Sequence, residues 1–99
     1  MTISLTLELT DNRTTSAVIQ ALSLYRSQLQ TSIRRSKRKL AQFEEQYDVS
    51  TNTFLAHMAA EDLSGGDLEY IEWAGEAHLL EGLESEIGEI ERVQRQLQR

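Results

Sequence analysis

The side chains able to do chemistry in this sequence are few, and their spacing assembles no familiar reaction centre. His57 and Glu61 lie four residues apart, and Glu72, Glu76 and His78 are close in sequence. Helical carboxylate metal sites typically use Glu-x-x-His spacing, which is absent here. The chain also has no Cys, no G-x-S-x-G motif and no Gly-rich phosphate loop after a strand. We therefore predict that the protein is not an enzyme and has no catalytic residues, no metal and no cofactor.

A basic run, RRSKRK at residues 34–39, is the densest cluster of charge. Lys and Arg clusters bind the phosphates of nucleic acids, so DNA binding is one interpretation. The other is a solvated helix face whose charges pair with glutamates elsewhere in the chain. No aromatic residue interleaves the run to stack on bases, which favours internal pairing. The weaker nucleic-acid hypothesis uses Arg34, Arg35, Lys37, Arg38 and Lys39.

Residues 67–76, DLEYIEWAGE, place aromatic and aliphatic side chains among carboxylates. Trp and Tyr provide large contact areas at low entropic cost and often anchor protein interfaces. In the alternative interpretation Ile71 lies in the core while Tyr70 and Trp73 cover a short upstream helix. The partner-binding hypothesis uses Leu68, Glu69, Tyr70, Ile71, Glu72 and Trp73.

Residues 2–10, TISLTLELT, alternate strictly between polar and apolar side chains, which predicts a half-buried β-strand. The backbone groups of a lone strand need a ladder partner, and the rest of the chain offers no second strand pattern. We expect this strand to pair with the same strand of a second copy, or with an edge strand of another protein. Its apolar face consists of Ile3, Leu5, Leu7 and Leu9.

Helical periodicity accounts for most of the remaining chain. Apolar residues at steps of three and four predict a long helix at 15–47, a short one at 51–63 and a second long one at 67–97. We therefore predict one mainly α domain, 1–99: a long antiparallel helical hairpin with a short middle helix and an N-terminal β-strand that pairs in an oligomer. The basic run then lies opposite 76–84. The expected inner face of the last helix includes Leu68, Ile71, Ala74, Leu80, Leu83, Ile87, Ile90 and Leu97.

Charge is strongly segregated along the 99 residues, whose net charge is −6. Residues 1–43 carry seven basic and two acidic side chains, whereas residues 44–91 carry fourteen acidic and no basic ones. Such segregation suits pairing of opposite charges and argues against a general polyanion binder. With 39% apolar residues, below the usual 45–50% or so, the hairpin needs a second copy or another protein to cover its seams.

The chain lacks both an apolar run of 18 residues and the pattern of a signal peptide at its start. We expect a cytoplasmic protein without membrane contact.

Three stretches together resemble a known family: FEEQYDVS at 43–50, Phe54-Leu55, and GDLEYIEWAG at 66–75. Over roughly residues 40–83 the chain is similar to antitoxin-like proteins of prokaryotic type II toxin–antitoxin pairs, with Asp48 where that pattern has Gly. The resemblance implies a non-catalytic protein that binds and neutralises a cognate toxin, for example a small ribonuclease. Two alternatives stay open. One is a DNA-binding transcriptional regulator that contacts operator DNA through a dimeric N-terminal strand or the basic run, and the other is a homo-oligomeric (dimeric or higher) coiled-coil scaffold.

Overall fold

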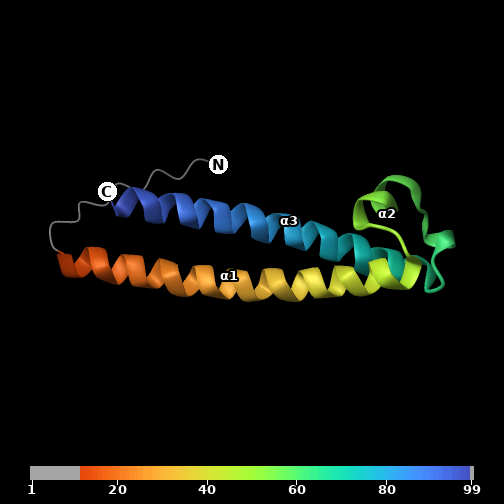
Figure 1. The fold of residues 1–99 in the computed structure, drawn as a ribbon, viewed down its shortest axis with the longest axis horizontal. Helices are drawn as coiled ribbons and strands as arrows, with labels where there is room; N and C mark the ends of the chain where they lie inside the picture. Colours follow the sequence, from red (N-terminus) through yellow and green to blue (C-terminus); the bar gives the residue numbers. More distant parts are fainter. Residues whose placement is uncertain (1–11, 99) are drawn as a thin grey trace.

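The computed structural model describes residues 12–98, which form two long antiparallel helices closed at one end by a short helical segment (Figure 1). The predicted helical hairpin with a short middle helix is confirmed, and the described residues contain no strand. The strand expected at residues 2–10, with Ile3, Leu5, Leu7 and Leu9, lies outside the described residues. In chain order the elements are α1 (Asn12–Tyr47), α2 (Thr51–His57), the 3-10 helix η1 (Ala60–Asp62) and α3 (Gly66–Leu97).

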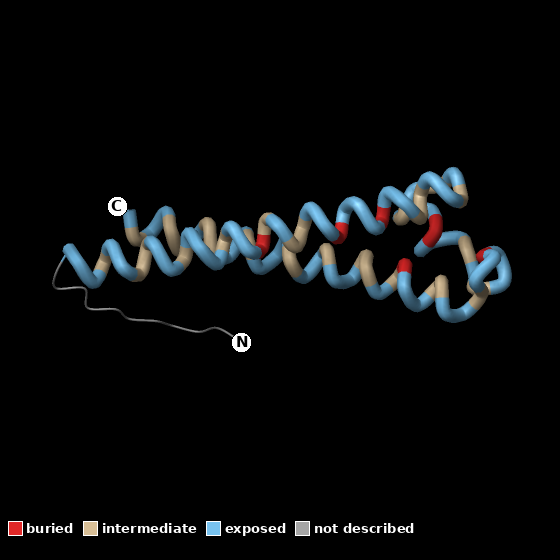
Figure 2. The backbone as a smooth tube through the Cα atoms, turned by 90° about the horizontal axis from the view of Figure 1, so that it is seen from below, coloured by how far each residue is buried: buried red, intermediate tan, exposed pale blue. Residues whose placement is uncertain are grey.

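The molecule is elongated, with extents of 59 × 25 × 20 Å, and its buried residues gather toward one end (Figure 2). We call residues 36–80 the head and residues 12–35 together with 81–98 the stalk. The head contains α2, η1 and the adjoining parts of α1 and α3, whose core consists of Leu40, Phe54, Leu63 and Trp73. Among the described residues of the stalk, only Leu29 is buried.

The corner between α1 and α2 is built by three backbone and side-chain features. Asp48 adopts a left-handed conformation with φ 55°, which Asp tolerates better than most residues. This conformation lets the Val49 N–H donate to the Glu44 carbonyl at 3.2 Å, a hydrogen bond typical of helix C-termini. The Ser50 hydroxyl then accepts from the Thr53 N–H at 3.1 Å and caps α2.

The short middle helix ends at His57 and not near residue 63 as predicted. Met58 and Ala59 are extended, and the Ala59 N–H donates to the Asp62 carboxylate at 2.9 Å, which starts η1. This break turns the chain back toward the hairpin. Leu63 is buried in the head as a result.

The inner face of α3 differs from the predicted one over its first two turns. Leu68 and Ile71 are 68% and 66% exposed, whereas Tyr70 is half-buried and Trp73 is fully buried. The aromatic pair has more apolar area to remove from water, and its burial fixes the rotation of the helix. From Leu80 onward the residues of the predicted inner face are half-buried.

Neither long helix, nor α2 between them, contains an apolar stretch sufficient to cross a membrane.

Candidate partner-binding surfaces

Trp73, a predicted partner-binding residue, is the centre of the head. Its ring stacks on Phe54 with centroids 3.9 Å apart and planes 1° apart, and on Phe43 at 5.2 Å. Its indole N–H donates to the Thr51 hydroxyl at 3.0 Å, so the polar edge is satisfied as well. Trp73 is therefore buried in the head, where it covers α2 together with Tyr70, as the alternative interpretation predicted.

Glu69 and Tyr70, also predicted to bind a partner, make contacts within the head. Tyr70 packs against Phe54 with ring centroids 5.0 Å apart. The Glu69 carboxylate accepts hydrogen bonds from the Tyr47 hydroxyl and from the Gly65 N–H. The Tyr47 oxygen in turn accepts from the Ser64 N–H at 3.1 Å. The end of α1, the loop and the start of α3 thus meet at one phenol oxygen.

The other three predicted partner-binding residues, Leu68, Ile71 and Glu72, lie together on the solvent side of α3. Helical spacing places them on one face with two further exposed residues, Gly75 and Leu79. We call these five residues the outer face of α3. No atom lies within 4 Å of a Cβ built on Gly75, so a partner can approach the backbone closely there. Contiguous exposed apolar side chains of this kind mark interaction sites.

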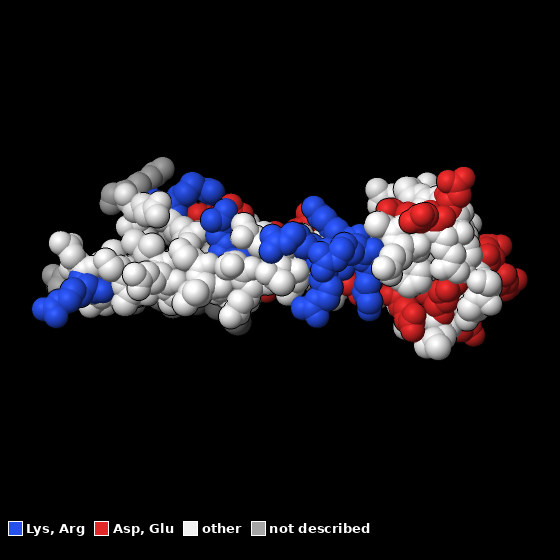
Figure 3. Space-filling model, turned by 60° about the horizontal axis from the view of Figure 1, so that its bottom comes forward, with Lys and Arg blue, Asp and Glu red and all other residues white. Residues whose placement is uncertain are grey.

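The basic run encircles α1 near the middle of the hairpin, and carboxylates cover the head beside it (Figure 3). Internal pairing, the favoured prediction, accounts for little of it: Lys39 reaches Glu76 at 3.9 Å, and Arg34 donates to the Thr31 hydroxyl at 3.3 Å. Three further cations are exposed and form no ion pair in the described part of the chain. They are Arg35, Lys37 and Arg38.

The predicted register of the hairpin is confirmed by contacts of the basic run. The buried Ser36 hydroxyl donates to the Glu76 carbonyl at 3.4 Å, and Lys39 reaches the Glu76 carboxylate. Residue 76 is the start of the segment, 76–84, that was expected opposite the run.

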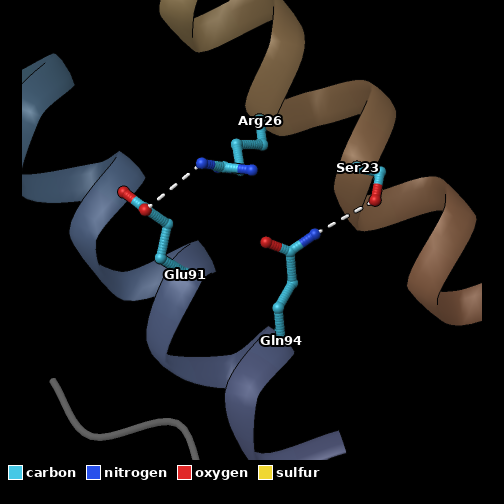
Figure 4. Close-up of polar contacts among 4 residues, drawn as sticks. All are labelled: Ser23, Arg26, Glu91 and Gln94. Atoms are coloured by element: carbon cyan, nitrogen blue, oxygen red, sulfur yellow. Dashed lines mark hydrogen bonds and ion pairs between the residues drawn. The ribbon is translucent and has the colours of Figure 1, made fainter. Parts of the chain in front are cut away.

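Polar side chains connect the two helices of the stalk (Figure 4). Arg26 lies 3.4 Å from the Glu91 carboxylate, and the Gln94 amide donates to the Ser23 hydroxyl at 3.2 Å. The Arg26 Nε–H is buried and has no acceptor among the described residues. Because partly exposed ion pairs contribute about 0–1 kcal/mol, these contacts align the stalk more than they stabilise it.

A groove of about 600 Å³ lies between α2 and the two long helices, and we call it the α2 groove. The buried Leu40 and the half-buried Ala77 and Leu80 form its apolar floor, and Leu55 of α2 forms a wall. Charged side chains on its rims are Lys37, Glu44, Glu81 and Glu84. This groove could not be predicted from the sequence, because it depends on where α2 ends and how the chain turns back.

Within residues 12–98, no three His, Asp or Glu side chains are grouped so that they could hold a metal ion. Protein-family models, curated proteins and solved structures contain no match to this chain.

Proposed function

We propose that this protein is a non-catalytic, protein-binding antitoxin that neutralises a cognate toxin, for example a small ribonuclease. The observation that carries the proposal is the outer face of α3. Two large aliphatic side chains, Leu68 and Ile71, stand about two-thirds exposed beside the carboxylates of Asp67 and Glu72, which form no ion pair in the described chain.

The chemistry of this surface suits a basic partner. Full burial of a Leu or Ile side chain contributes roughly 1.5–3 kcal/mol, so the pair supplies an apolar anchor at the centre of an interface. No Lys or Arg occurs between residues 44 and 91, so the charged side chains that α3 itself places next to Leu68 and Ile71 are all acidic. Complementary charge accelerates association with a nuclease that carries a basic nucleic-acid surface.

Co-expression with the product of the neighbouring reading frame tests the proposal. The double variant Leu68→Ser/Ile71→Ser should fold, because both side chains are exposed, yet fail to co-purify with the neighbour and fail to rescue growth. Leu24→Ser is the matched control, since Leu24 is also 68% exposed but lies in the stalk. Absence of a complex with the wild-type chain, or an unchanged complex with the double variant, would contradict the proposal.

A second candidate function, binding of operator DNA, is supported by three cations that form no ion pair with any described residue, Arg35, Lys37 and Arg38. In a gel shift with the upstream DNA at low salt, the Arg35→Ala/Lys37→Ala/Arg38→Ala variant should bind more weakly and with a shallower salt dependence. Equal binding by the variant would exclude the basic run as the DNA contact.

The stalk supports self-association, because the apolar side chains between its two helices are mostly only half-buried. A homodimer or higher oligomer that covers these side chains sediments as one species at micromolar concentration, whereas a monomer at that concentration would argue against a scaffold.

A further inference from the structure

We propose that the α2 groove is a docking site for a basic amphipathic helix of another protein, separate from the outer face of α3. This goes beyond the proposed function, because it does not require the partner to be a toxin.

The groove offers an apolar floor to the apolar side of a helix. Its volume is about 600 Å³ and Leu40, Ala77 and Leu80 line it, and amphipathic helices bind other proteins by laying their apolar face into such a groove. Leu55 remains 40% exposed although the neighbouring Phe54 is fully buried. Helix α2 therefore presents one large side chain to the core and the next to the groove.

The charges on the rims select a basic occupant. Glu81 and Glu84 lie one turn apart on the α3 side, are exposed, and form no ion pair among the described residues. On the α1 side, Glu44 accepts the Thr51 N–H at 2.7 Å, and Lys37 is the single cation. Because the rims carry three carboxylates and one ammonium group, they favour an occupant that presents Lys or Arg side chains.

This charge pattern disfavours two occupants that the chain itself could supply. The side chains of residues 1–11 include two carboxylates and no Lys or Arg, so Glu81 and Glu84 would repel them. The basic run of a second copy has the right charge, but residues 34–39 contain no aliphatic or aromatic side chain to fill the apolar floor. A partner helix that carries both cations and an apolar stripe meets both requirements.

The test uses three synthetic peptides of about four helical turns: a Leu/Lys helix with Leu at helical spacing, a scrambled peptide of the same composition, and a Leu/Glu helix. Binding is followed by the fluorescence of Trp73, the only Trp, whose indole donates to the groove residue Thr51. NMR shifts of Leu55 and Ala77 locate the contact. Only the Leu/Lys helix should bind and shift both residues.

Two variants and one control make the test specific. Glu81→Gln/Glu84→Gln and Leu55→Ser should each weaken binding of the Leu/Lys helix at least about tenfold, which corresponds to about 1.4 kcal/mol. Asp67→Asn/Glu72→Gln removes the same charge beside the outer face of α3 and should leave affinity unchanged. Equal binding of the scrambled or Leu/Glu peptide, an equal loss in the control, or NMR shifts confined to Leu68 and Ile71 would each overturn the proposal. Because the toxin test depends on Leu68 and Ile71, the two proposals can fail independently.

Discussion

The head and the stalk are built from the same two amphipathic helices, yet they hold together in different ways. In the head a third element, α2 with its return loop, covers the hairpin and buries Phe54, Leu63 and Trp73 completely or nearly so. In the stalk, as far as residues 12–98 show, only two helices meet, and the seam is half-buried and partly polar. Amphipathic periodicity produces a seam in both regions, but only a third covering element turns it into a core.

Removal of Trp73 is the most severe test of this contrast. Trp73→Ala should lower the free energy of unfolding by about 3–5 kcal/mol, because a fully buried stacked ring leaves a cavity. Ile90→Ala, in the half-buried seam of the stalk, should cost less than half as much. Urea denaturation followed by far-UV circular dichroism compares them, and equal losses would mean that the head is not the stability centre.

The Tyr47 hydroxyl should matter more than its counterpart in the stalk. Tyr47→Phe removes an oxygen that contacts both Ser64 and Glu69 and should cost about 1–2 kcal/mol. Tyr25→Phe removes a single exposed hydrogen bond to Glu86 and should change stability by less than about 0.5 kcal/mol. Thermal unfolding of both variants gives the comparison, and a reversed order would contradict it.

A substitution at the corner between α1 and α2 should stabilise the head. Asp48→Gly should raise the free energy of unfolding by about 1 kcal/mol, because Gly adopts φ 55° without the steric cost that a Cβ imposes. Asp48→Val, with a β-branched side chain at the same φ, should lower it. Loss of stability in the Gly variant would show that the Asp48 side chain makes a contribution larger than its strain.

The stalk should tolerate Gly→Ala substitutions that destabilise the head. A Cβ at Gly82 or Gly88 meets no atom within 4 Å, so Gly82→Ala and Gly88→Ala should each add about 0.5–1 kcal/mol through helix propensity. Gly66→Ala is the control: it meets equally open space, but its φ of +62° makes any side chain strained. Destabilisation by Gly88→Ala would reveal a close packing partner for the stalk.

Alkaline pH should loosen one stalk contact. The hydrogen bond from Tyr25 to Glu86, with smaller contributions from desolvation and charge repulsion, raises the pKa of the Tyr25 phenol above its ordinary value of 10.0. The folded state holds this proton more tightly than the unfolded state, so the contribution is present below pH 10.0 and is lost as pH rises through the folded pKa. Ultraviolet titration of tyrosinate should detect a late-titrating phenol that Glu86→Gln returns toward normal.

The sequence predicted the hairpin and its register because both depend on two long matched patterns. The rotation of α3 at its start was mispredicted because two pairs of residues satisfy helical spacing equally well: Leu68 with Ile71, and Tyr70 with Trp73. Only packing in the folded protein decides which pair is buried. The same choice separates the six predicted partner-binding residues into three that build the head and three that remain exposed. The α2 groove follows from a helix end at His57, which has no distinctive signal in the sequence.

The Tyr47 junction also implies an order of folding. Its hydrogen bonds join residues only 17 and 22 apart in sequence, whereas Ser23–Gln94 and Arg26–Glu91 join residues 71 and 65 apart. Closing the longer loops directly costs about 1 kcal/mol more in chain entropy than closing the shorter ones. Folding should therefore begin at the head and then extend along the stalk toward its open end. Amide hydrogen exchange should slow steadily from residues 20 and 94 toward the junction.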